Sequence, residues 1–141
     1  MVKQFQLIEI DKYDKQHLEA TYHILSKREF HISHKSLPTF SQHINFVKNH
    51  PYRVWYLIKD ANSFLGTSYL GEDNSVGITL LSGLQSDYEI VINTMLTMHK
   101  PFHPIQSLRS SYFHFNIHPK NTSLINAVKA LGFSHIQNTY A

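Results

Sequence analysis

Three consecutive segments rich in β-branched and aromatic residues constrain this chain more than any other feature. They are RVWYLIK (53–59), FLGTSYLG (64–71) and SVGITLL (75–81), and only the short turn clusters DANS and EDN separate them. Segments of this composition joined by tight turns are typical of strands that pair with their neighbours in the chain. The sequence therefore predicts an antiparallel meander in the middle of the chain.

Helix and strand patterns alternate after the meander. Because helices lie between strands in this half, part of the sheet should be parallel and covered by helices. We predict one α/β domain over residues 1–141, with a mixed sheet and the order β-α-α-β-β-β-α-β-α-β. The further elements expected are a strand at 5–10, a helix from an Asp14 cap to about Lys27, a helix from Thr39 or Ser41 to before Pro51, helices at 86–99 and 121–131, and strands at 111–118 and 133–140.

The first two helices each carry apolar residues at the spacing i, i+4, i+7, which places such residues on one helix face. These faces are expected to pack against the sheet. The expected stripes are Leu18, Tyr22 and Leu25 on the first helix, and Phe40, Ile44 and Val47 on the second.

Composition excludes several classes of protein. The chain is 42% hydrophobic and has no cysteine, so disorder is not expected, and disulfides and thiolate metal sites are excluded. No apolar run approaches the roughly 18 residues of a membrane span, and the first residues lack a signal-peptide core. We therefore expect a cytoplasmic protein with no membrane partner. The net charge of +3 is scattered over single Lys and Arg residues, which does not favour nucleic acid as a partner.

The stretch FHFNIHPKNTSLINAVKALGF (113–133) joins a strand with one polar face to a capped helix. Asn121 after Pro119 is a good N-cap, and Gly132 suits the left-handed position that ends a helix. A polar strand face ahead of a free helix N-terminus makes a cleft that favours anions. By strand alternation, Phe113, Phe115 and Ile117 share one face, and Tyr112, His114, Asn116 and His118 share the other.

Pro119-x-Asn121, followed eleven residues later by Gly132-Phe133, resembles the last conserved segment of the GNAT superfamily of N-acetyltransferases. Leu131 also fits that pattern, and the predicted order of elements is similar to the GNAT fold. The stretch from Arg28 through the meander resembles small bacterial members, some of which acetylate nucleotide-linked amino sugars. The resemblance implies transfer of an acetyl group from acetyl-CoA to the amine of a small acceptor, an amino sugar being one such acceptor.

The resemblance also implies a pyrophosphate-binding loop, for which the matching segment is SGLQSDYEI (82–90). The implied cofactor contacts there are Gln85, Ser86, Asp87, Tyr88 and Glu89. Gln85 fits the family pattern, whereas Tyr88 and Ile90 replace small residues. Either the loop holds CoA in an altered way, with Tyr88 pointing away from the ligand, or CoA binding is lost. We expect retention, because the opposite side of the cleft matches the family. The tyrosine that protonates the leaving thiolate in many members is replaced here by Val128.

Acetyl transfer needs an amine without its proton, a stabilised oxyanion and an acceptor held near the carbonyl. In the family, amides where the fourth and fifth strands diverge serve the oxyanion. That relation points to the stretch 78–81 on one side, with Ile78, Thr79 and Leu80 as the implied cofactor contacts, and to Asn116 on the other. Asn121 would contact the pantetheine arm. We therefore predict that these two strands are parallel neighbours that splay apart, with Asn116 lining the gap.

The remaining candidates are side chains that could contact the acceptor. Histidine works as a base near neutral pH, and His43 matches a histidine of the amino-sugar enzymes, although a surface histidine is the alternative. His31, with His34, lies in the loop expected to roof the acceptor pocket. Tyr69 and Glu72 could face the cleft, and Arg28 could bind an anionic group of the acceptor; an edge-strand pair and a surface charge are the alternatives.

Two function classes stay open at this point. The first is an acetyl-CoA-dependent N-acetyltransferase acting on a small-molecule amine. The second is a non-catalytic GNAT-fold binding module that has lost CoA. No metal is expected, because His114 and His118 would lie about 13 Å apart on a strand; a site built on the histidines of HISH (31–34) is the alternative. A homodimer is also left open.

Overall fold

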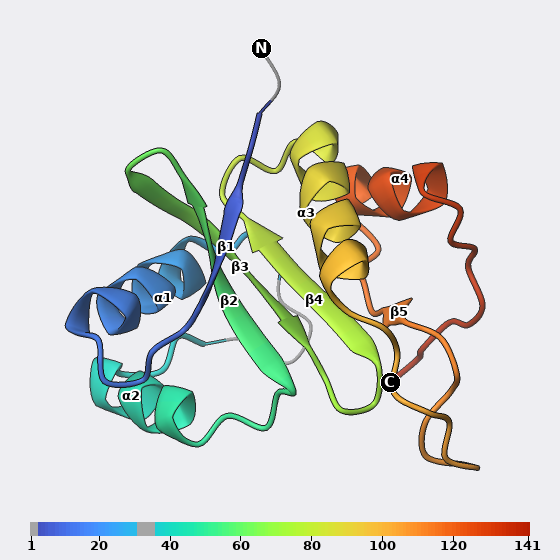
Figure 1. The fold of residues 1–141 in the computed structure, drawn as a ribbon, viewed down its shortest axis with the longest axis horizontal. Coiled ribbons are helices and arrows are strands. Elements are labelled where there is room, and N and C mark those ends of the chain that lie inside the picture. The colour runs from blue at the N-terminus through green and yellow to red at the C-terminus, as the bar shows by residue number, and fades with distance from the viewer. Residues whose placement is uncertain (1–2, 31–35) are drawn as a thin grey trace.

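The computed structural model describes residues 3–30 and 36–141, which form a five-stranded mixed sheet with four helices (Figure 1). The strands run in the order in which they occur in the chain, from β1 at one edge to β5 at the other. The elements are β1 (Gln6–Glu9), α1 (Lys15–Lys27), α2 (Phe40–Lys48), β2 (Val54–Asp60), β3 (Ser63–Leu70), β4 (Ser75–Leu80), α3 (Gln85–Met98), β5 (His114–Phe115) and α4 (Thr122–Ala130).

The first four strands pair antiparallel, and β5 then pairs parallel with β4. The predicted meander and the predicted parallel portion of the sheet are both confirmed. The parallel ladder is short, because only Ser75 with His114 and Val76 with Phe115 are in register. The crossover between these two strands contains α3, as a parallel connection requires.

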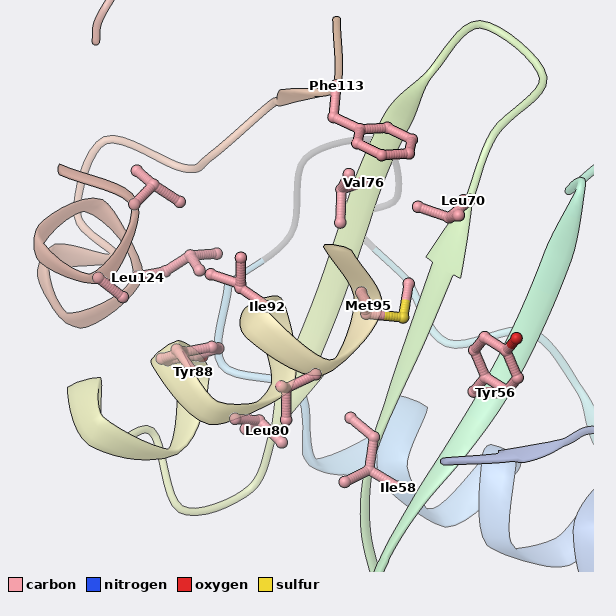
Figure 2. Packing of buried hydrophobic residues seen from close by; sticks show 13 residues of the cluster. Tyr56, Ile58, Leu70, Val76, Leu80, Tyr88, Ile92, Met95, Phe113 and Leu124 are labelled. Carbon is pink, nitrogen blue, oxygen red and sulfur yellow. The ribbon is translucent and has the colours of Figure 1, made fainter. Parts of the chain in front are cut away.

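Helices cover both faces of the sheet (Figure 1). On one face Leu18 of α1, Val47 of α2 and Trp55 of β2 form a small cluster. The other face carries the main hydrophobic core, built from β2, β3, β4, α3 and α4. In Figure 2, Tyr88, Ile92 and Met95 project from α3 into this core, with Leu124 of α4 on its far side.

Side-chain caps fix where three helices begin, as predicted. The Asp14 carboxylate accepts from the amides of Gln16 and His17, and Thr39 forms a capping box with Gln42. Asn121 accepts from the Leu124 amide at 3.3 Å. Each cap satisfies an amide that the first turn of a helix leaves without an intrahelical partner.

The packing faces of the first two helices differ from the predicted stripes. On α1 the buried residues are Leu18, Thr21 and Ile24. Tyr22 is only half-buried, and its hydroxyl donates to the Pro38 carbonyl at 2.8 Å, so it ties α1 to the segment before α2. On α2 the buried pair is His43 and Val47, so the hydrophobic pattern alone missed the histidine.

The chain beyond α4 does not form the predicted strand at 133–140. Phe133 packs edge-on against Phe115, with ring centroids 5.0 Å apart, but the residues after it are exposed and pair with no strand. The strand predicted at 111–118 is shortened to His114–Phe115 because the chain leaves β4 after Phe115. Without a ladder partner on either side, an alternating pattern cannot form a strand.

The helices of the described residues are all too short or too polar to cross a membrane.

Candidate functional site

The backbone of β4 is open along the edge where β5 leaves it. Leu81 donates its amide to the Leu65 carbonyl at 2.9 Å, and Gly71 donates to the Ser75 carbonyl at 2.8 Å, both across the β3 side. Since an antiparallel strand directs alternate residues to opposite neighbours, Ile78 and Leu80 direct their amides and carbonyls away from β3. The parallel register with β5 ends at Val76 and Phe115, so the predicted parallel neighbours that splay apart are present, but Asn116 does not line the gap as predicted.

A pocket of about 320 Å³ lies at this divergence, and we call it the β4–α4 pocket. Its walls come from the end of β4, the loop into α3, the start of α4 and the end of α1. Six residues predicted from sequence line it: Arg28, Ile78, Thr79, Leu80, Tyr88 and Asn121. Leu81, from the predicted strand end, and Ser82 and Gly83, from the segment matched to the pyrophosphate loop, line it as well. The lining residues that the sequence did not indicate are Lys27, Glu29, Phe30, Lys120, Thr122 and Ser123.

The helix that opens beside this pocket, α3, begins without a side-chain cap. Leu84 is its N-cap residue, and its side chain makes no capping hydrogen bond. Within residues 3–30 and 36–141, no protein acceptor takes the amides of Gln85 and Ser86. Free amides and the helix dipole favour an anion at such a helix start.

Asp87 does not place its charge in the pocket. Its side chain is buried, accepting from the Ser82 hydroxyl at 2.8 Å and from the Lys3 ammonium group at 3.2 Å. Gln85, Ser86 and Glu89 also lie outside the residues that line the pocket, at the start of α3. The carboxylate thus holds the loop before α3 from its buried side.

Tyr88 has its ring in the hydrophobic core and contributes to the pocket wall. The residue is 4% exposed. Burial raises the pKa of Tyr88, whereas hydrogen bonds from the Asn121 side chain and the Leu80 backbone act in the opposite direction, and the nearby Glu29 raises it slightly further. The side chain therefore connects α3 with the open edge of β4 and with the cap of α4.

His43 lies between α1 and α2 and does not line the pocket. It is 3% exposed, its Nε2 is 2.7 Å from the Thr21 hydroxyl, and its ring lies against Tyr22 at 5.3 Å. Burial lowers the pKa of His43, which favours the neutral ring. The alternative of a surface histidine is wrong. This geometry favours a packing role for His43. A catalytic role stays a prediction, and the position of His43 outside the pocket does not support it.

Three other candidates also lie away from the pocket. Tyr69 stacks on Tyr52 with ring centroids 4.0 Å apart, and burial raises its pKa. Glu72 is exposed in the turn before β4, at the opposite end of that strand from the pocket, and its carbonyl accepts from Arg109 at 3.0 Å. Asn116 follows β5 with an exposed side chain and is not part of the lining. His31 lies outside the described residues.

Arg28 brings positive charge to the pocket from the end of α1. Burial lowers the pKa of Arg28, while the neighbouring Tyr52 and Tyr69 raise it. Lys27 and Lys120 add two exposed cations to the lining. Lys120 stands inside the quoted Pro-x-Asn motif, so sequence could have indicated it. No sequence motif indicates that Lys27 and Glu29 line the pocket, because only the fold brings these residues to β4.

A second pocket of about 420 Å³ lies between α2 and the segment that follows β1. Exposed ends of α2 and of the segment after β1 line it, including Lys12, Lys48 and His50. It contains no residue that was predicted as a site residue, so the smaller β4–α4 pocket is the better candidate. Among the described residues, no three His, Asp or Glu side chains converge on a common metal position.

No family model matches the chain, and neither the curated protein sequences nor the solved structures contain a significant match to it.

Proposed function

We propose that the chain is an N-acyltransferase of the GNAT type, which transfers an acetyl group from acetyl-CoA to a small-molecule amine. The observation that carries this proposal is the short parallel ladder between β4 and β5. The ladder ends at Val76, so the backbone of Ile78 lies on the wall of a pocket that is bordered by the starts of α3 and α4. An open strand edge of this kind binds an extended amide-containing chain as an added strand, and the pantetheine arm of CoA is such a chain.

The two ends of the acetyl-CoA molecule fit different parts of the site. Its pyrophosphate meets the free amides of Gln85 and Ser86 at the start of α3, where a helix dipole favours an anion. Lys120 and Lys27 supply positive charge nearby. These contacts use backbone amides and the helix dipole. They therefore do not require glycines in the loop around Tyr88.

The thioester end lies deeper in the pocket in this proposal. The Ile78 amide stabilises the oxyanion that forms when the amine attacks the carbonyl carbon. Glu29, which lines the pocket from just after the end of α1, attracts the ammonium form of an acceptor before the amine loses its proton. An amine acceptor therefore fits the site, and an amino sugar is the class that the sequence resemblance favours.

Calorimetric titration of the purified chain with acetyl-CoA tests this function. We expect a dissociation constant in the micromolar range for acetyl-CoA. Pantetheine, which lacks the pyrophosphate, should bind more weakly. Release of free thiol on addition of a panel of primary amines would then identify the transfer reaction. Absence of binding at millimolar acetyl-CoA would leave the second class, a non-catalytic binding module, as the function of this fold.

A further inference from the structure

Two arginines pack against the ring of Phe102 beside the start of β4. The Arg53 guanidinium carbon lies 3.8 Å from the ring centre, and that of Arg109 lies 5.1 Å from it. Phe102 is itself held at both backbone groups by the Asn74 side chain, at 2.7 and 3.0 Å. A fixed aromatic ring therefore brings two permanent positive charges together.

Backbone carbonyls fix the two guanidinium groups further. Arg53 donates from Nη1 to the Lys100 carbonyl at 2.8 Å. Arg109 donates from Nε to the His103 carbonyl at 2.7 Å and from Nη1 to the Glu72 carbonyl at 3.0 Å. An arginine side chain has five N–H donors, so both groups keep donors that these bonds do not use. Both residues are half-buried, which leaves those donors within reach of a ligand from solvent.

No carboxylate of the described residues neutralises this pair. Neither Arg53 nor Arg109 takes part in an ion pair there. Glu72 offers Arg109 its carbonyl and not its carboxylate, and the Asp73 carboxylate accepts from the Ser75 amide at 2.9 Å. Guanidinium groups that the protein holds in place, without an acid of its own, are well suited to bind an anion.

Neighbouring side chains favour an anion with more than one charge. Lys100 is exposed directly after His99, and His103 is exposed on the other side of the ring residue in the chain. Burial lowers the pKa of His99, and the Arg53 charge lowers it further, whereas Glu9 acts in the opposite direction. The positive charge at this surface therefore exceeds what one carboxylate balances. A phosphate group carries about 1.5 to 2 negative charges at neutral pH.

We propose that Arg53 and Arg109 form a binding site for a small molecule that carries a diphosphate group. Each guanidinium donates to one of the two phosphate groups, and Phe102 sets the distance between the guanidiniums. The site lies at the opposite end of β4 from the β4–α4 pocket, and none of these three residues lines that pocket. It does not depend on the proposed acyl transfer.

NMR titration of the isotope-labelled chain with pyrophosphate tests this site without any variant. We expect the Phe102 amide and the Nε–H signals of Arg53 and Arg109 to shift. The amides of Gln85 and Ser86 report separately on the anion site of the proposed function. Shifts at Gln85 and Ser86 alone would overturn the arginine site and leave the proposed function standing. No shift at Phe102 at millimolar pyrophosphate would overturn the arginine site as well.

Arg53→Gln, compared with Lys12→Gln, tests the role of the guanidinium. Glutamine keeps an N–H donor for the Lys100 carbonyl but has no charge, whereas Lys12→Gln removes one charge from an exposed position in the other pocket. From the shift of the Phe102 amide, we expect Arg53→Gln to bind pyrophosphate at least about tenfold more weakly than wild type. Lys12→Gln should stay within about twofold of wild type, because exposed charges at a distance are screened by salt.

The remaining outcomes also decide the proposal. Equal affinities of Arg53→Gln and Lys12→Gln would show that only general positive charge attracts the ion, which contradicts the site. Succinate, which carries two carboxylates, should bind more weakly than pyrophosphate at the same ionic strength. Equal binding of the two would contradict the preference for phosphate. If Arg53→Gln does not fold, the titrations of the wild-type chain decide.

Discussion

The side-chain amide of Asn74 pairs with both backbone groups of Phe102. The Phe102 amide donates to the Asn74 oxygen at 2.7 Å, and the Asn74 NH₂ donates to the Phe102 carbonyl at 3.0 Å and to the Ser110 carbonyl at 2.9 Å. Asn74 is fully buried in the turn before β4, and its own carbonyl accepts from the His114 amide at 3.1 Å. This one residue therefore fixes where the chain returns from α3 and where β5 meets β4.

Replacement of Asn74 should destabilise the fold strongly. Asn74→Ala removes three hydrogen bonds, leaves backbone groups of the 102–110 segment unpaired, and forces alanine into a left-handed conformation (φ 69°). We expect a loss of about 3–5 kcal/mol in the free energy of unfolding, measured by urea denaturation. Asn74→Gly loses the same bonds without the backbone strain, so it should be about 1 kcal/mol less destabilised. Equal stability of Asn74→Ala and wild type would show that these bonds contribute nothing net.

The start of α3 should be sensitive to proline if it holds pyrophosphate. Ser86→Pro removes one of the two free amides and constrains the first turn, so acetyl-CoA binding should weaken by about 1–3 kcal/mol. Ser41→Pro is the matched control, because Ser41 holds the same second helical position in α2, away from the pocket. Calorimetry on both variants, after melting curves confirm folding, measures the difference. If a folded Ser86→Pro protein binds acetyl-CoA as tightly as Ser41→Pro, the pyrophosphate lies elsewhere.

The buried position of Tyr88 changes what a glycine replacement should do. The sequence alone predicts that Tyr88 points away from the ligand, so that Tyr88→Gly would leave acetyl-CoA binding intact or improve it. In the structure Tyr88→Gly empties a core position within a helix, so we expect a loss of about 3–5 kcal/mol. Tyr88→Phe fills the same space and should lose about 1 kcal/mol. Urea unfolding of the two variants measures both effects, and a glycine variant as stable as the phenylalanine variant would contradict the packing described here.

His43 should make stability depend on pH in the mildly acidic range. Burial lowers its pKa in the folded state below the ordinary value of 6.5, so the unfolded chain binds a proton more readily as the pH falls. Stability is therefore fully present above pH 6.5 and decreases as the pH falls below it. His43→Gln, which keeps a polar group near Thr21, should show a shallower decrease between about pH 7.5 and 5 in urea unfolding. An equal slope in both proteins would assign the effect to other histidines, such as His50 and His99, whose pKa values burial also lowers.

Local chemistry made several features of the fold predictable. The cap at Asn121 and the left-handed glycine at 132 depend on one or two residues, and both are confirmed. The alternation at 113–117 is also confirmed, because Phe113, Phe115 and Ile117 pack on the core while Asn116 is exposed. These features follow from short-range geometry, which a sequence displays directly.

The features that failed depend on partners far away in the chain. A strand at 133–140 needs an adjacent edge, and no pattern inside the segment reveals that β5 would be only two residues long. His43 was predicted as a site residue, with a surface position as the alternative, and neither reading could foresee its burial, because that requires Thr21 on another helix. The contributions of Lys27 and Glu29 to the pocket arise only because the end of α1 approaches β4.

The two-residue ladder between β4 and β5 has a mechanical consequence. Almost the whole attachment of α4 to the remainder of the molecule consists of side chains, such as Leu124 and Val128 against α3. Side-chain contacts can slide by a fraction of a residue, whereas a long ladder would have to break backbone hydrogen bonds to do so. We therefore expect the gap beside Ile78 to vary in width more readily than the spacing between β3 and β4, where the ladder is continuous.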